Sequence, residues 1–76
     1  MLAETINGYL LRQPFVAFRI EKTGGVWYEV HNPAMASVSR HTVELGFPIE
    51  NGKQRFVTIA LVHVMSVEIF LPVPGS

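Results

Sequence analysis

The 76-residue sequence contains no cysteine, only one tryptophan, and few charged residues, which make up 16% of the chain. Without cysteine the chain can form neither disulfides nor thiolate-bound zinc sites, the two devices that often stabilise a domain of this size. Six basic and six acidic residues give a net charge of zero, with no run of like charge, which disfavours a dominant phosphate-binding surface. The fold must therefore rest on packing, and a content of 49% hydrophobic residues favours self-association.

The sequence also lacks membrane and export signals. No apolar stretch approaches the length of about 20 residues that spans a bilayer. The first eight residues carry Glu4 and no basic residue, unlike a secretory signal. We therefore expect a cytoplasmic protein with a single domain over residues 1–70 and a disordered tail over residues 71–76, where two prolines precede a terminal Gly-Ser.

Helical spacing is present only near the N-terminus. Leu2, Ile6 and Leu10 recur at intervals of four residues and predict one amphipathic helix of about three turns. Because a residue that precedes proline is biased away from the α conformation, Pro14 should end this helix at Gln13.

Beyond Pro14 the apolar residues alternate with polar ones, which is typical of strands. Gly24-Gly25 separates two such stretches and predicts a hairpin. A change of phase at Ser39-Arg40-His41 predicts a tight turn between two further strands, and the segment 48–53, with Asn51-Gly52, predicts a loop.

The apolar run from Phe56 to Ile69 could form one buried helix by periodicity alone. Its many valines and isoleucines favour two strands instead, which we place on either side of a turn at Leu61-Val62-His63. In the second of these strands Met65, Val67 and Ile69 should face the interior.

This order of elements predicts a mostly β fold: a small SH3-like or Sm-like barrel of about five strands with an N-terminal α-helix. Gln13-Pro14-Phe15, the glycine turn, Glu29-Val30 and Pro33 together resemble a pattern shared by short bacterial proteins of uncharacterised function. A helix followed by five strands is also similar to the Sm-like fold. That resemblance implies ring assembly through strand edges, whereas RNA-binding Sm proteins carry a basic residue at the last turn, where this chain has Ala60-Leu61-Val62.

The sequence shows no pattern typical of an enzyme or a metal protein. His31, His41 and His63 are not spaced as a metal site requires. A set of hydroxyl, imidazole and carboxylate side chains lies close together in the sequence, but strand alternation should spread it over both faces of a sheet: Ser37, Ser39, His41 and Glu44. We therefore predict a protein that is not an enzyme and has no catalytic residue, metal or cofactor.

Several aromatic residues fall on the polar side of the predicted strands. Trp27, Phe56 and Phe70 are the interface candidates, because exposed apolar side chains mark interaction surfaces. We expect a non-enzymatic interaction module that forms a homo-oligomer through strand edges and these aromatics. The alternative is weak Sm-like binding of RNA or single-stranded nucleic acid through Arg19, Lys22 and Arg40, which the zero net charge disfavours.

Overall fold

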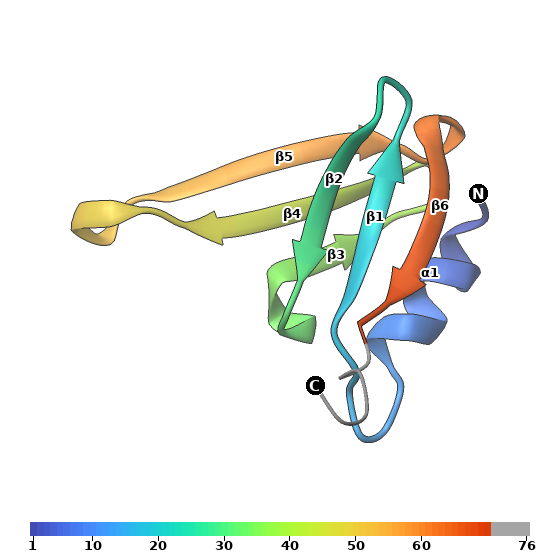
Figure 1. Cartoon of the computed structure of the whole chain (residues 1–76), viewed down its shortest axis with the longest axis horizontal. Coiled ribbons are helices and arrows are strands. Elements are labelled where there is room, and N and C mark those ends of the chain that lie inside the picture. The colour runs from blue at the N-terminus through green and yellow to red at the C-terminus, as the bar shows by residue number, and fades with distance from the viewer. Residues whose placement is uncertain (71–76) are drawn as a thin grey trace, which may run out of the picture.

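A computed structural model describes residues 1–70, apart from the side chain of Glu50. The chain is mostly β, with one N-terminal helix and six strands in two antiparallel three-stranded sheets (Figure 1). Sheet A has the strand order β2-β1-β6 and sheet B the order β3-β4-β5. The elements are α1 (Ala3–Leu10), β1 (Phe18–Lys22), β2 (Val26–Val30), β3 (Ala36–Val38), β4 (Thr42–Pro48), β5 (Gln54–Ala60) and β6 (Val64–Ile69), with 3-10 turns η1 (Pro33–Met35), η2 (Glu50–Gly52) and η3 (Leu61–His63).

The mostly β class and the N-terminal helix are confirmed, and the chain has six strands where we expected about five. The six correspond to the three predicted strand pairs, on either side of Gly24-Gly25, of Ser39-Arg40-His41 and of Leu61-Val62-His63. The predicted disordered tail lies outside the described residues. Within residues 1–70, no helix has the length and apolar character needed to cross a membrane.

Helix α1 is shorter than the sequence predicts and ends at Leu10 rather than Gln13. Ile6 and Leu10 are its buried residues, and the next positions on this face would be 13 and 14. Because proline at 14 prevents helix there, a further turn would bury no additional apolar side chain. Leu11, which would begin that turn, is 68% exposed.

Sheet A follows the predicted alternation. Phe18, Ile20 and Val30 are fully buried, and Arg19 lies on the opposite face. Strands β1 and β2 join through Gly24 and Gly25, whose φ angles of 95° and 80° lie in the left-handed region that favours glycine.

Sheet B contains a long hairpin, β4–β5, that projects past the body of the molecule (Figure 1). Its inner face carries Val43, Leu45 and Ile59, all buried. At its tip, Asn51 and Gly52 have φ angles of 65° and 72°, which matches the loop predicted from Asn-Gly. We call the distal part of this hairpin, residues 46–56, the arm.

The prediction that Met65 faces the interior is wrong, since its side chain is 61% exposed. Lys22 pairs with Val64 and Glu21 pairs with Ser66, so Met65 is an extra residue in a β-bulge. The bulge shifts the alternation by one position, and Val64 takes the buried site instead.

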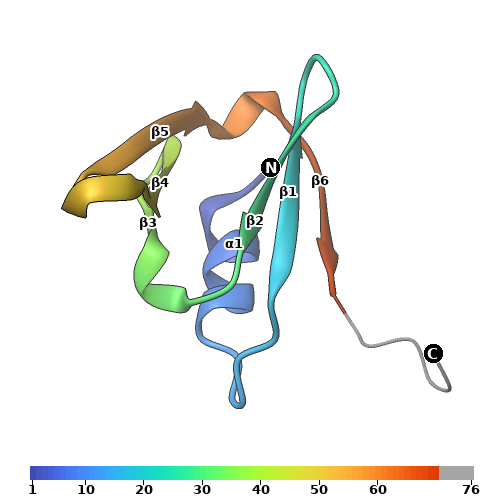
Figure 2. The same ribbon diagram turned by 60° about the vertical axis from the view of Figure 1, so that its left-hand side comes forward.

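The core lies between the two sheets, and α1 fills the opening between them (Figure 2). The segment from Phe56 to Ile69 forms two strands joined by η3, as predicted, and not a helix. Phe15, just after Pro14, also packs against this core, with its ring centroid 6.0 Å from that of Phe18.

Candidate functional site

The outer face of sheet A carries a cluster centred on Arg19. The Arg19 guanidinium lies 4.0 Å from the centre of the Trp27 ring and 5.7 Å from that of Phe70. Its Nε and Nη2 atoms donate to the same oxygen of Glu68, at 3.2 and 2.8 Å. Strand register explains the arrangement, because Arg19 in the central strand lies directly opposite Glu68 in β6.

Phe70 extends this cluster toward β2. The His31 ring stacks on the Phe70 ring, with centroids 6.0 Å apart and an angle of 4° between the planes. His31 Nε2 also lies 2.8 Å from Oε2 of Glu29. The structure therefore brings two of the three interface candidates, Trp27 and Phe70, together around one arginine.

The same contacts weaken the case for nucleic-acid binding at Arg19. Its charge is opposed by Glu68 and its flat face is taken by Trp27, so a phosphate would have to displace a carboxylate. Lys22 lies at the bulge end of β1, and Arg40 lies in the turn between β3 and β4 of the other sheet. The three basic candidates thus come from separate places in the fold.

Replacing Arg19 with alanine should lower the free energy of unfolding by about 1 kcal/mol, because an exposed cation–π contact and an exposed ion pair each contribute less than that. Circular dichroism during urea unfolding measures the effect. Arg19→Lys is the matched control: it keeps a cation near Glu68 but loses the flat guanidinium over Trp27, so it should restore only part of the loss. Equal stability of Arg19→Ala and the wild type would contradict a structural role for the cluster.

Phe56, the third interface candidate, lies apart from the cluster on the outer face of sheet B and is 64% exposed. It pairs across the hairpin with Gly46. A Cβ atom on Gly46 would lie 3.2 Å from Cε1 of Phe56, so glycine leaves room for the ring to lie across the neighbouring strand.

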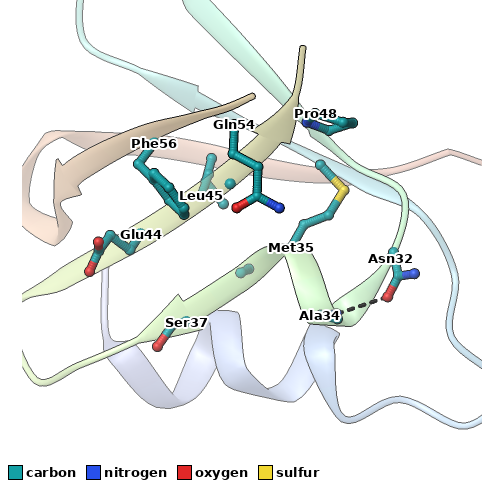
Figure 3. A pocket seen from close by; sticks show the side chains of 11 residues that line it. Asn32, Ala34, Met35, Ser37, Glu44, Leu45, Pro48, Gln54 and Phe56 are labelled. Carbon is teal, nitrogen blue, oxygen red and sulfur yellow. Dashed lines mark hydrogen bonds between the residues drawn. The ribbon is translucent and has the colours of Figure 1, made fainter. Parts of the chain in front are cut away.

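A hollow of about 420 Å³ opens between this ring and η1 (Figure 3). Glu44, Gln54 and Ser37 supply its polar groups, and Met35 and Pro48 supply apolar ones. Its lining includes neither a histidine nor a basic residue.

The segment from β5 to β6 carries further exposed apolar side chains. Val62 in η3 is 83% exposed, and Met65 in the bulge is 61% exposed. Residues 54–69 therefore contain three large apolar side chains that are exposed to solvent: Phe56, Val62 and Met65. The three side chains belong to β5, η3 and β6 respectively.

His63 and Ser39 make side-chain contacts near turns. His63 lies 3.5 Å from the Thr23 hydroxyl, and Ser39 bonds the Thr42 side chain at 2.6 Å within the turn before β4. Over the part of the chain that the structure describes, no group of three His, Cys, Asp or Glu side chains could hold a metal ion.

The sequence pattern did not single out Val62, Met65 or Arg55 as surface residues of interest. Val62 and Met65 look like core residues in an unbroken apolar run, and only the bulge and the 3-10 turn expose them. Arg55 did carry a signal, since it has the same parity as the inward Val57 and Ile59. Comparison of the chain with protein-family models, curated proteins and solved structures gives no match.

Proposed function

We propose that this chain is a non-enzymatic interaction module that self-associates, with β5 of one copy pairing with β6 of the next. The supporting observation is that residues 54–69 combine two strands at sheet edges with exposed Phe56, Val62 and Met65. Because β5 and β6 are different edges, each copy joins the next head-to-tail. A series of copies joined in this way leaves no edge unpaired only when it closes into a ring. In this proposal the two sheets are halves of an SH3-like, Sm-like barrel, with η3 as the last turn.

Backbone groups on β5 are available for such pairing. Ile49 N–H donates to Lys53 O at 2.9 Å, and Leu61 N–H donates to His41 O at 2.8 Å, one at each end of the β4–β5 ladder. Because bonded pairs alternate along an antiparallel ladder, the odd residues of β5 bond to β4. The even residues, including Phe56 and Thr58, therefore direct their N–H and C=O groups to the free edge.

The same reasoning applies to β6. Phe70 N–H donates to Ala17 O at 2.7 Å, so even residues of β6 bond to β1 beyond the bulge. Val67 and Ile69 then direct their backbone groups outward. Unpaired strand edges of this kind pair readily with other strands unless they are protected.

Thr58→Pro should abolish self-association while it preserves the fold. Proline removes an outward N–H and leaves the ladder to β4 intact. At about 100 µM, light scattering should give a multiple of 8.5 kDa for the wild type and for Thr58→Ala, which keeps the N–H, and 8.5 kDa for Thr58→Pro.

Two outcomes would end this proposal. One is a wild-type mass of 8.5 kDa at that concentration, and the other is a folded Thr58→Pro variant that stays assembled. Binding of single-stranded nucleic acid is the alternative proposal, and it would require Arg19 to leave Glu68 and Trp27. It requires that added oligouridine raises the mass and that the affinity falls steeply with salt.

A further inference from the structure

A second surface lies along the edge of β2, away from β5 and β6. A groove of about 670 Å³ runs between β2 and the arm. Its floor is formed by Tyr28 and Phe47, whose ring centroids are 6.0 Å apart, and by Met35. All three side chains are half-buried and pack against the core.

The groove follows the edge of β2 rather than one of its faces. Four consecutive residues, 26–29, line it. Consecutive side chains of a strand point to opposite faces of the sheet, so these four residues do not share a face. They share the edge of β2. Odd residues of β1 bond to β6, as the Phe70–Ala17 bond shows, and even residues of β1 therefore bond to β2. Trp27 and Glu29 consequently direct their backbone N–H and C=O groups away from the sheet.

One cation lies on the inner wall of this groove. Arg55 is on the face of β5 that also carries Val57 and Ile59, and it pairs across the hairpin with Phe47. Among the described side chains the ion pairs are Arg19–Glu68 and His31–Glu29, and neither includes Arg55. The carboxylate of Glu29, also on the groove, is bonded to His31.

We propose that this groove binds an extended peptide that adds to β2 as a fourth strand of sheet A and places a carboxylate against Arg55. The free backbone groups of Trp27 and Glu29 supply the main-chain bonds, as in other cases of strand addition. Tyr28 and Phe47 contact the apolar side chains on either side of the acidic one.

A second copy of this chain fits the groove less well than an acidic peptide does. If β2 of another copy paired here, its residues on the Tyr28 side would be Val26, Tyr28 and Val30, and none is acidic. The inner residues of β6 beyond its bulge, Val67 and Ile69, also lack a carboxylate. The arginine thus selects a partner with an acidic side chain at an inward position.

A fluorescein-labelled nine-residue peptide with uncharged, blocked termini tests this proposal. It has threonine at every even position, valine at positions three and seven, aspartate at position five and serine at both ends. The wild type should bind it about tenfold more tightly than the same peptide with lysine at position five, as measured by fluorescence anisotropy. A peptide of the same composition with adjacent valines, which breaks the alternation, should bind more weakly than the aspartate peptide.

Arg55→Glu should reverse the preference in favour of the lysine peptide. Arg12→Glu makes the same change of net charge at an exposed position just after α1, and it should leave the preference unchanged. Repeating the titrations in Thr58→Pro separates this proposal from self-association, because that substitution does not alter the groove.

Equal affinity for the aspartate and lysine peptides would overturn the proposal, as would no binding of either up to about 1 mM. An Arg55→Glu variant that changes the mass of the assembly without changing peptide preference would also overturn it, and would assign the groove to another copy.

Discussion

Replacing Phe18 with alanine is expected to lower the midpoint of thermal unfolding by about 20 °C. Phe18 is fully buried between the sheets, and its ring contacts those of Tyr9 and Phe15 at centroid distances of 5.3 and 6.0 Å. Truncation of a buried phenylalanine costs about 3 to 5 kcal/mol. In a domain of this size each kcal/mol corresponds to about 4 to 8 °C.

Phe56→Ala is the matched control, because it makes the same chemical change in a strand residue that is 64% exposed. It should shift the midpoint by less than about 5 °C, since the ring contacts mainly its cross-strand neighbour Gly46. The measurement is calorimetry at low protein concentration, where the copies are dissociated. The loss of a subunit contact then does not contribute to the shift of either variant. Similar shifts for both variants would contradict the placement of the core.

The fate of these two phenylalanines shows how far strand alternation alone can predict this fold. Phe18 has the parity of Ile20 and Phe56 has the parity opposite to Ile59, and the structure buries the first and exposes the second. Parity is predictable because a strand with one buried face has its register fixed by the apolar residues.

Alternation fails where the backbone departs from a regular strand. Met65 is the extra residue of a bulge that depends on how β6 meets Lys22 and Glu21, a contact made across more than 40 residues. Helix α1 likewise ends three residues early, because with Pro14 on its buried face a further turn would bury no additional apolar side chain. Boundaries and bulges are set by tertiary contacts, which one sequence does not display.

The candidate surfaces were predictable in part for the same reason. Trp27, Phe56 and Phe70 stood out because they break the alternation of their strands. The meeting of Trp27 and Phe70 around Arg19 depends on the order β2-β1-β6, which brings the last strand beside the first. The groove beside the arm depends on how the two sheets meet, so the inward parity of Arg55 was visible in the sequence but the residues around it were not.

Both proposals use strand edges because this fold leaves them open. Edge strands β2 and β6 of sheet A and edge strand β5 of sheet B retain outward backbone groups in the described structure. Small β domains usually protect such edges with charge, proline or a covering element. Here β5 and β6 instead carry exposed Phe56 and Met65, which favours self-pairing, whereas β2 faces a groove with an arginine, which favours a different partner.

Ile6→Asp should unfold the domain, because α1 is part of the core and not an appendage. Ile6 is fully buried and belongs to the core cluster, and its helix α1 lies between the two sheets (Figure 2). Aspartate at this position would either bury an unpaired charge or pull the helix away from the sheets. A buried charge without a partner is among the most destabilising single changes, and small domains have little stability to lose.

Thr5→Asp makes a matched change one residue earlier, at an exposed position in the first turn of the same helix. It should leave stability unchanged or raise it by a few tenths of a kcal/mol, since a negative charge near a helix N-terminus is favourable. Circular dichroism during thermal unfolding distinguishes the two variants. A cooperative transition retained in Ile6→Asp would mean that the two sheets fold without the helix, and the core would then have to close by other contacts.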